Sequence, residues 1–317
     1  MKYNLKIVNG AHHEYNVIIF LLTNIFPEYN IPDSHNVNNP KFILGISANL
    51  DNKLNGKKDG KMTYYLDETV KIPYLFWTGE SFDVEVKSKT GKHKYLIISS
   101  LSSNPETVKM PFASFWYIQF YLNDYLTKYR NKTYFKKTEY LAYCSTKNTP
   151  ERNQFMNLLI ERSNNPKNIH CLGKCKYKEC LNKEIKRTTP PNTLLIDEYS
   201  KYKFVLTMEN SNVKGYVTEK ILCALVAGSI PIYWGDHHYA KKLFNPNAFI
   251  CIQDFENFEL CIDYILNMKD EDIQRMLFEP IFKDNIPSPE FDITNFSDNS
   301  FYGNLKKKIR NMCIETI

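Results

Sequence analysis

A short polar segment follows an apolar run in the second half of the chain. Glu209, Asn210 and Ser211 come directly after residues 202–208, a run typical of a buried strand. The carboxyl ends of parallel strands are where open α/β sheets present groups to ligands. A helix is predicted from residue 217 onward, and the first backbone amides of a helix favour a phosphate group. This segment therefore predicts a ligand site.

Charged and polar residues stand together where that helix is expected to begin. Lys220 places a full positive charge beside the helix amides, and Glu219 can accept two hydroxyl hydrogens of a sugar. Tyr216 and Thr218 complete the polar set. The pattern predicts a nucleotide-sugar site. A capped amphipathic helix would show much of the same pattern, with Glu219 as a first-turn residue favoured by the helix dipole.

The composition excludes several classes of protein. The chain has 317 residues, 43% hydrophobic and 24% charged, which is ordinary for a globular protein and long enough for two domains. The net charge of +6 suits an anionic small ligand or a membrane surface as well as nucleic acid. The lysine clusters are scattered, so we expect no nucleic-acid partner. No dinucleotide fingerprint, P-loop, H-E-x-x-H or G-x-S-x-G motif occurs.

Metal-binding patterns in the sequence are weak. Cys171, Cys175 and Cys180 with His170 miss the paired C-x2-C spacing of zinc sites, which favours a Lys-rich loop. The Asp-x-Asp at 270–272 favours a solvated helix terminus over a metal-held diphosphate. We expect no metal site and no required cofactor, although a divalent metal could be stimulatory. Cysteines inside apolar runs indicate buried free thiols and a reducing compartment.

The pattern of apolar residues predicts an α/β protein with two lobes and a cleft between them. In the second half, strands alternate with helices, which implies a parallel sheet. There we expect strands at 140–144, 202–208, 230–234 and 248–252, and helices at 151–160, 217–226 and 258–268. In the first half we expect a helix at 13–26, strands at 41–46 and 74–77, a loop at 51–61 and a long helix at 112–129.

The sequence predicts a soluble, cytoplasmic protein. The longest strongly apolar run, 17–22, is too short to cross a membrane, and no signal-peptide pattern is present. Phe301, Leu305, Ile309 and Met312 would share one face of a terminal helix whose other faces are basic. Such a helix could make a peripheral contact with an anionic membrane. The alternative is a terminal helix that packs back onto the first domain.

The segment 208–235 strongly resembles the α-1,3/4-fucosyltransferases, glycosyltransferase family ten. The hallmark of that family is F-E-N-S, then Y-x-T-E-K, then A-G-x-x-P-x-x-x-G. Here these motifs stand at 209–211, 216–220 and 227–235, with Met208 in place of the family's Phe. Gly215 stands where many animal members have Asp. The resemblance is specific from about residue 140 to 265, and it is thinner in the first half, at 78–81 and 108–111.

This resemblance implies a GT-B transferase with two Rossmann-like domains facing a central cleft. We expect an N-terminal acceptor-binding domain at 1–138, a C-terminal GDP-fucose-binding domain at 139–300 and a C-terminal helix at 301–317. The implied reaction is inverting transfer of L-fucose from GDP-β-L-fucose to a hydroxyl of N-acetylglucosamine, or a related sugar, in a glycan acceptor. An α-1,3 linkage is expected. The alternative is an inactive relative that binds a glycan or nucleotide sugar, and the oligomeric state is left open.

The resemblance also implies roles for individual residues. The family's catalytic base matches Glu80, which follows the expected strand 74–77; Asp83 and Glu85 are rivals without the motif. Gly79 would let the chain turn and leave room for a sugar. Thr149-Pro150-Glu151-Arg152-Asn153 resembles the family's P-x-R-N, although Arg152 could instead be a surface helix residue. The expected donor-binding residues are Arg152, Asn210, Ser211, Tyr216, Thr218, Glu219 and Lys220, with Arg152 and Lys220 neutralising the diphosphate.

Overall fold

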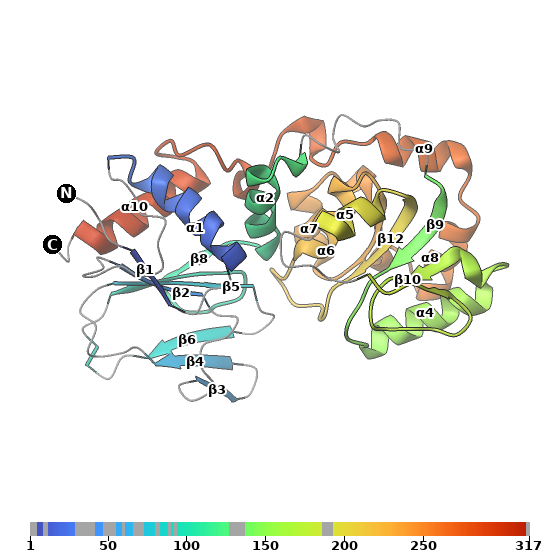
Figure 1. Ribbon diagram of the computed structural model, residues 1–317, viewed down its shortest axis with the longest axis horizontal. Helices are drawn as coiled ribbons and strands as arrows, with labels where there is room; N and C mark the ends of the chain where they lie inside the picture. Colours follow the sequence, from blue (N-terminus) through green and yellow to red (C-terminus); the bar gives the residue numbers. More distant parts are fainter. Residues whose placement is uncertain are drawn as a thin grey trace. The chain divides into compact units, whose positions relative to one another are not determined.

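The protein folds into two compact units. The computed structural model describes residues 5–8, 12–28, 42–46, 55–58, 61–65, 73–79, 83–87, 90–91, 94–126, 137–185 and 193–314. Unit 1 comprises Met1–Leu122 and Pro289–Ile317, and unit 2 comprises Asn123–Ser288 (Figure 1). These boundaries differ from the expected divisions at 138/139 and 300/301. The reason is local packing in unit 1, where the ring of Phe291 lies 5.1 Å from that of Tyr117 and Tyr302 Oη donates to Glu290 O at 2.9 Å.

Unit 2 is built on a parallel sheet with a reversal of strand order. The first strand, β9 (Glu139–Tyr143), is central, with β10 (Ile169–Cys171) and β11 (Leu181–Asn182) on one side. On the other side follow β12 (Tyr202–Met208), β13 (Ile230–Trp234) and β14 (Ile250–Cys251). This is the strand order of doubly wound nucleotide-binding sheets, and ligands bind such sheets where the order reverses, here between β9 and β12.

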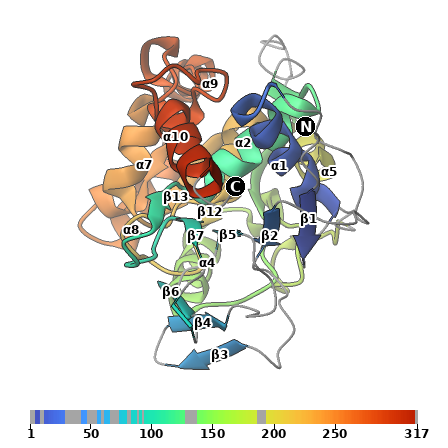
Figure 2. The same ribbon diagram turned by 90° about the vertical axis from the view of Figure 1, so that its left-hand side faces the viewer.

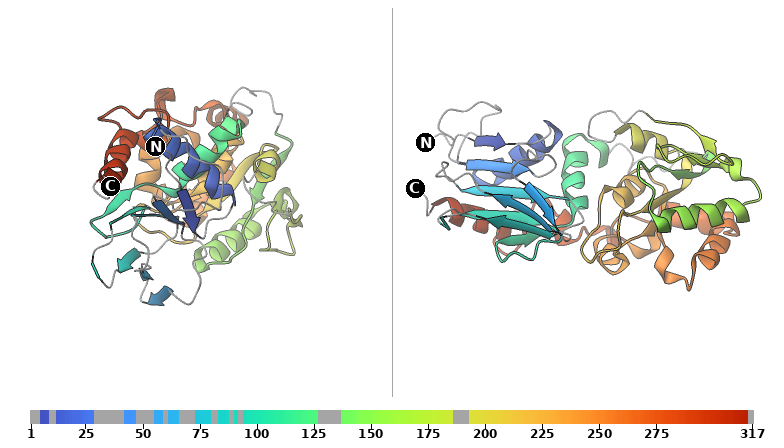
Figure 3. Two further views of the ribbon diagram at one scale, coloured as in Figure 1. Left: turned by 60° about the vertical axis from the view of Figure 1, so that its left-hand side comes forward. Right: turned by 90° about the horizontal axis from the view of Figure 1, so that it is seen from below.

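Helices cover the sheet of unit 2. Phe155 of α4 and Phe258 of α8 pack edge to face with ring centroids 5.4 Å apart, so these two helices lie side by side (Figures 1 and 3). The expected helix at 217–226 begins at Glu219, because Thr218 has extended backbone geometry and forms the N-cap. The helices are α4 (Pro150–Arg162), α5 (Thr193–Tyr199), α6 (Glu219–Val226), α7 (His237–Leu243), α8 (Phe258–Leu266) and α9 (Asp270–Phe278), with short 3-10 turns η1 (Pro166–Asn168), η2 (Pro246–Ala248), η3 (Ile252–Asp254) and η4 (Lys283–Asn285).

Unit 1 contains a parallel sheet whose strands follow chain order. Its strands are β1 (Leu5–Val8), β2 (Phe42–Ile46), β5 (Tyr74–Thr78), β7 (Tyr95–Ser99) and β8 (Thr107–Lys109). The central strand β5 is buried along its whole length, as its apolar sequence predicts for a strand covered on both faces.

A second, three-stranded sheet in unit 1 corrects one expectation. It consists of β3 (Asn55–Lys58), β4 (Lys61–Tyr65) and β6 (Asp83–Lys87). The stretch 51–61, expected to be a loop, therefore contains a whole strand and the start of another. β3 and β4 pair antiparallel with Lys58 opposite Lys61, so polar residues here form an edge hairpin.

Three helices lie on one face of the larger sheet of unit 1. They are α1 (His12–Ile25), α2 (Phe112–Leu122) and α10 (Phe301–Ile314). The 3-10 turn η5 (Pro289–Phe291) precedes α10 in the chain. Figures 1 and 2 show the three helices on the side of the larger sheet opposite the three-stranded sheet. α2 ends before the expected residue 129. Asp124 has a φ of 59°, and this left-handed conformation cannot continue a helix.

The C-terminal helix α10 packs within unit 1. Leu305 and Ile309, two residues of the expected membrane-facing stripe, are buried at 1% exposure. Arg310 donates to Ile25 O at 2.8 Å and forms an ion pair with Glu28 at the end of α1. The structure thus favours the packing alternative over a membrane contact for this face. Among the residues described above, no helix combines the length and apolar character needed to cross a bilayer.

Candidate functional site

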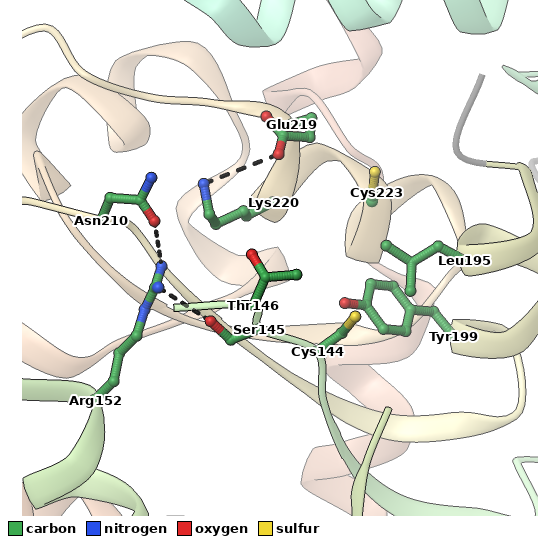
Figure 4. Close-up of a pocket in the computed structure, with 10 residues that line it drawn as sticks. All are labelled: Cys144, Ser145, Thr146, Arg152, Leu195, Tyr199, Asn210, Glu219, Lys220 and Cys223. Atoms are coloured by element: carbon green, nitrogen blue, oxygen red, sulfur yellow. Dashed lines mark hydrogen bonds and ion pairs between the residues drawn. The ribbon is translucent and has the colours of Figure 1, made fainter. Parts of the chain in front are cut away.

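A pocket of about 120 Å³ lies at the carboxyl edge of the unit 2 sheet. Its walls come from the residues after β9, the loop after β12 and the first turn of α6, with side chains from α4 and α5 (Figure 4). The pocket therefore sits at the strand-order reversal, where this type of sheet binds ligands. The residues that line it are Cys144, Ser145, Thr146, Arg152, Leu195, Tyr199, Asn210, Glu219, Lys220 and Cys223.

Arg152 is a buried cation in this pocket, with an exposure of 2%. Its Nη1 donates to Ser145 Oγ at 3.1 Å and to Lys147 O at 3.0 Å, and its Nη2 donates to Asn210 Oδ1 at 3.0 Å and to Met208 O. All these acceptors are neutral. Within the described ranges no carboxylate forms an ion pair with Arg152. A buried charge of this kind is costly unless it is paired, so the pocket is built to receive an anion.

The local sequence explains why Arg152 faces inward. Thr149 caps helix α4 by accepting from the backbone amide of Arg152 at 3.4 Å, and Pro150 occupies the first turn. Phe155, three positions after Arg152, is completely buried, as is Leu159 seven positions after it. Arg152 thus lies on the buried face of α4. The alternative of a surface helix residue is wrong.

The loop after β10 holds Ser145 in place beside Arg152. The backbone amide of Cys175 donates to Ser145 O at 3.0 Å. Gly173 approaches the same residue so closely that a Cβ there would lie 2.2 Å from Ser145 O. Only glycine permits that approach. The position of the Arg152 acceptor therefore depends on a neighbouring loop.

The start of α6 supplies the second cation and free amides. Lys220 Nζ lies 2.9 Å from Glu209 Oε2 and donates to Thr218 Oγ1 at 2.9 Å, while Glu219 Oε1 is 3.9 Å away. Thr218 occupies the N-cap position but caps no helix amide, because its hydroxyl contacts Glu209. The first amides of α6 therefore have no side-chain cap, and such amides are an anion site.

Carboxylates keep Lys220 charged. Burial acts to lower the pKa of Lys220, but Glu209 and, to a smaller extent, Glu219 outweigh it and raise that pKa above its ordinary value. The side chain keeps 24% exposure. Lys220 is therefore a permanent cation at the open side of the pocket.

The pocket brings together only some of the expected donor-binding residues. Arg152, Asn210, Glu219 and Lys220 line it, the last two at the start of α6. Ser211, Tyr216 and Thr218 are not in its lining. Tyr216 and Thr218 are 4% and 1% exposed, and Ser211 Oγ is buried without a hydrogen-bond partner. A direct contact of these three residues with a donor stays a prediction.

Sequence reasoning missed the residues after β9 and on α5. Cys144 is the last residue of the strand expected at 140–144, and Ser145 and Thr146 follow it, so the rule applied to 202–208 also points to this end of the strand. Helix α5 was not predicted; its Leu195 and Tyr199 give the pocket an apolar side, across from Arg152 (Figure 4).

The expected catalytic base, Glu80, lies outside the described residues. The strand before it is confirmed as β5. A Cβ at Gly79 would lie 2.3 Å from the ring of Phe112, so that ring fills the space expected for a sugar. The rivals have structural partners: Asp83 accepts from the Ser103 backbone amide at 2.7 Å, and Glu85 accepts from Thr63 Oγ1 at 3.4 Å.

The acidic residues of the weak Asp-x-Asp pattern form ion pairs with basic side chains. Asp270 and Asp272 stand in the first turn of α9, where they pair with Lys203 at 2.9 Å and Arg275 at 3.0 Å. Across the described ranges, no three His, Cys, Asp or Glu side chains are grouped as metal ligands. The eight cysteines are thiols outside any disulfide, and all except Cys144 are buried, which confirms the expected buried thiols.

Comparison with known proteins agrees with this geometry. Residues 131–279 match the family model described as "Glycosyltransferase family 10 (fucosyltransferase) C-term". Most of unit 2 is thus similar to the C-terminal domain of that family. All ten pocket residues fall inside the matched segment. The resemblance identified from the sequence is confirmed.

Curated relatives of this chain are described as fucosyltransferases. The chain is 34% identical over 172 residues to a putative fucosyltransferase of Acanthamoeba polyphaga mimivirus, covering 51% of this chain and 26% of that protein. It is 53% identical over 66 residues to an α-(1,3)-fucosyltransferase of Helicobacter pylori, covering 21% of this chain and 14% of that protein. The matches thus span about a quarter or less of these relatives.

Solved structures with the same fold cover almost the whole chain. A crystal structure of an α1,3-fucosyltransferase with GDP-fucose matches with a TM-score of 0.64 and 20% identity, over 98% of this chain and 90% of that one. Another, with GDP, matches equally well. These similarities and the parallel sheets of both units confirm the expected α/β, GT-B class. The central cleft between the domains stays a prediction.

Proposed function

We propose that this protein is an inverting fucosyltransferase. It moves L-fucose from GDP-β-L-fucose to a hydroxyl of N-acetylglucosamine, or a related sugar, in a glycan acceptor, and it forms an α-1,3 linkage. The family 10 match and the fucosyltransferase relatives support this assignment. The choice of donor is supported by the solved structure of similar fold that is described with GDP-fucose.

One observation carries the proposal: a buried arginine that pairs with no carboxylate among the described residues faces a pocket at the strand-order reversal. Arg152 and Lys220 bring two cations to that pocket, and the uncapped amides of α6 add partial positive charge. When the bond to fucose breaks, negative charge grows on the diphosphate of GDP. Cations and amides fixed in advance stabilise that charge without reorganisation.

The remaining walls suit the rest of a nucleotide sugar. Glu219 lines the pocket with a side chain 25% exposed, and its carboxylate can accept from two neighbouring hydroxyls of ribose or fucose. The apolar side formed by Leu195 and Tyr199 suits a flat base. In this proposal Asn210 orients Arg152 through their hydrogen bond.

Inversion also needs a base that takes the proton of the acceptor hydroxyl. We assign this role to Glu80, on the family motif after β5. A positioned carboxylate of this kind typically contributes about 10²–10⁴-fold to the rate. Because side chains and helix amides supply the positive charge at the diphosphate, no divalent cation is required in this proposal, and chelation of metal ions should leave transfer measurable.

The test combines binding with turnover. Calorimetric titration with GDP measures the site, and incubation with GDP-fucose, with and without N-acetylglucosamine acceptors, measures GDP release and the linkage formed. We expect GDP to bind and its release from GDP-fucose to depend on the acceptor. Absence of GDP binding would refute the proposal.

The second candidate is an inactive relative that binds a glycan or nucleotide sugar. Such a protein would bind GDP but would release none from GDP-fucose beyond the rate without acceptor. The same two measurements therefore separate the two functions. Retention of both cations and of Glu219 in one pocket favours the enzyme.

A further inference from the structure

A buried carboxylate stands directly behind the pocket. Glu209 is the first residue after β12 and has no solvent exposure, and it is not part of the pocket lining. A buried carboxylate is costly unless partners compensate its charge. Its partners therefore indicate what it does.

Within the described part of the chain, the four contacts of the Glu209 carboxylate are all with residues at the start of α6. Oε1 accepts from the Thr218 backbone amide at 2.7 Å and lies 3.0 Å from Thr218 Oγ1. Oε2 lies 2.8 Å from the same hydroxyl and 2.9 Å from Lys220 Nζ. Both oxygens are thus occupied by Thr218 and Lys220, and neither is directed to a ligand.

Strand β13 closes the other side of Glu209. The backbone amide of Glu209 donates to Trp234 O at 2.8 Å. A Cβ at Gly235 would lie 2.8 Å from Glu209 Cγ and 2.5 Å from Tyr233 Oη, so a glycine is needed for the side chain to fit. Trp234 and Gly235 therefore pack against one side of Glu209, and its carboxylate contacts Thr218 and Lys220 on the other side.

We propose that Glu209 is a positioning residue that acts through Lys220. Its carboxylate fixes the ammonium of Lys220 at the pocket, keeps it charged, and turns the Thr218 hydroxyl away from the α6 amides so that these can meet the diphosphate. It does not touch the donor. This inference rests on the proposed function of the same pocket.

The groups around Lys220 determine in which direction its pKa should move when Glu209 is neutralised. Glu209 faces it from the end of β12, Glu219 from its own helix and Tyr216 from the preceding loop, and behind Glu209 stand Tyr233 and Asp236. Burial is the largest influence on the pKa of Lys220 and lowers it, whereas Glu209 is the largest influence that raises it. Neutralising Glu209 therefore lets the pKa of Lys220 fall.

The experiment measures GDP affinity of the full chain by calorimetry between about pH 7.2 and 8.7, where a phosphate group with a second pKa near 6 is already almost fully ionised. We expect flat affinity for the wild type. For Glu209→Gln we expect an affinity that falls at least about fivefold toward the alkaline end, as Lys220 loses its proton. Combining Glu209→Gln with Lys220→Arg should remove that fall, because arginine stays charged.

The outcomes separate this inference from the proposed function. If the wild type binds no GDP, the proposed function fails. If the wild type binds but Glu209→Gln loses affinity equally at every pH, or loses none, Glu209 does not act through the charge of Lys220 and the inference is overturned.

Asp254→Asn, which removes the surface partner of Lys241, serves as the matched control and should leave the pH profile of GDP affinity flat. If Glu209→Gln does not fold, Glu209→Asp replaces it, because its shorter carboxylate holds Lys220 less closely. An affinity that falls toward the alkaline end then supports the inference, and a flat profile contradicts it.

Discussion

Arg152 of α4 meets Asn210 of the loop after β12 at 3.0 Å, so the helix that follows β9 and the loop that follows β12 join at one pocket. β9 and β12 are neighbours in the sheet although more than fifty residues separate them in the chain. One arginine side chain therefore links the two halves of the unit 2 sheet at the point where strand order reverses. Removing the Arg152 side chain should therefore lower ligand affinity more than it lowers the free energy of unfolding.

We expect Arg152→Ala and Lys220→Ala each to lower kcat/KM for GDP-fucose by about 30-fold or more. Losing a charge-assisted contact with a developing diphosphate charge typically costs about 2–4 kcal/mol in the transition state. Steady-state kinetics with varied donor measures the loss. Arg162→Ala is the matched control, because this arginine stands on the same helix and pairs with Asp263 at the surface. Rates near wild type for either pocket variant would exclude its role.

Glu219→Gln should raise KM for the donor about fivefold or more while stability stays within about 0.5 kcal/mol of the wild type. The amide keeps the size of the side chain but accepts fewer hydroxyl hydrogens. Glu259 is an acid in the first turn of α8. If Glu219 acts only through the helix dipole, Glu219→Gln and Glu259→Gln should lower the free energy of unfolding by the same amount. Unchanged kinetics with equal stability in both variants would exclude a donor contact.

Glu80→Ala should lower transfer by about 10²–10⁴-fold and leave GDP affinity unchanged, because a base acts on the acceptor and not on the nucleotide. Rate assays with a saturating acceptor and calorimetry with GDP check the two halves of this prediction. Glu85→Ala is the comparison and should retain transfer. If Glu85→Ala lost transfer and Glu80→Ala retained it, the catalytic base would be Glu85 and not Glu80.

Gly235→Ala should weaken both the fold and GDP binding. The added Cβ would lie 2.8 Å from Glu209 Cγ, so the carboxylate behind Lys220 must move. Overpacking of this kind costs about 1–3 kcal/mol. Denaturant unfolding and GDP titration measure the two effects. Gly91→Ala, whose Cβ would meet nothing within 4 Å, shows the cost of the backbone change alone.

Lys137 should make stability depend on pH. Burial lowers the pKa of Lys137 from 10.5 to about 8. Between those values the unfolded chain keeps a proton that the folded chain has lost, so this group raises the free energy of unfolding as pH increases. Relative to Lys137→Met, the wild type should gain up to about 3 kcal/mol across this window. Urea unfolding at several pH values measures the difference, and a constant difference would contradict the prediction. Lys203→Met, at a surface ion pair, is the control.

The sequence predicts β12, β13 and the start of α6 well, because each has a strong local signal, whereas it does not reveal α5. β12 and β13 are apolar runs, and the start of α6 carries a polar cluster before an amphipathic segment. The hairpin of β3 and β4 was missed since its strands are polar, although Asp-Gly at 59–60 is a typical signal for a two-residue turn. The early end of α2 depends on one left-handed residue, Asp124, which periodicity does not reveal.

Roles at the site are harder to predict than elements. Glu219 adjoins Lys220 in the sequence and Glu209 is eleven residues away, yet Glu209 makes the closer contact, at 2.9 Å against 3.9 Å. Glu209 is buried behind the pocket, whereas Glu219 lines it. Which carboxylate faces a ligand depends on the Thr218 hydroxyl and on the backbone at Gly235, and both are tertiary contacts. Likewise, only folding, which brings β9 and β12 together, shows that the acceptors of Arg152 in the described part of the chain are neutral.

The division of unit 1 into two chain segments has a consequence for biosynthesis. Unit 2 is one continuous stretch, so a ribosome delivers all its strands before any of Pro289–Ile317 appears. Unit 1 must wait for α10, whose Arg310 secures the end of α1 through Ile25 O and Glu28. During vectorial synthesis unit 2 can thus mature while unit 1 is still incomplete, because α10 is translated after all of unit 2.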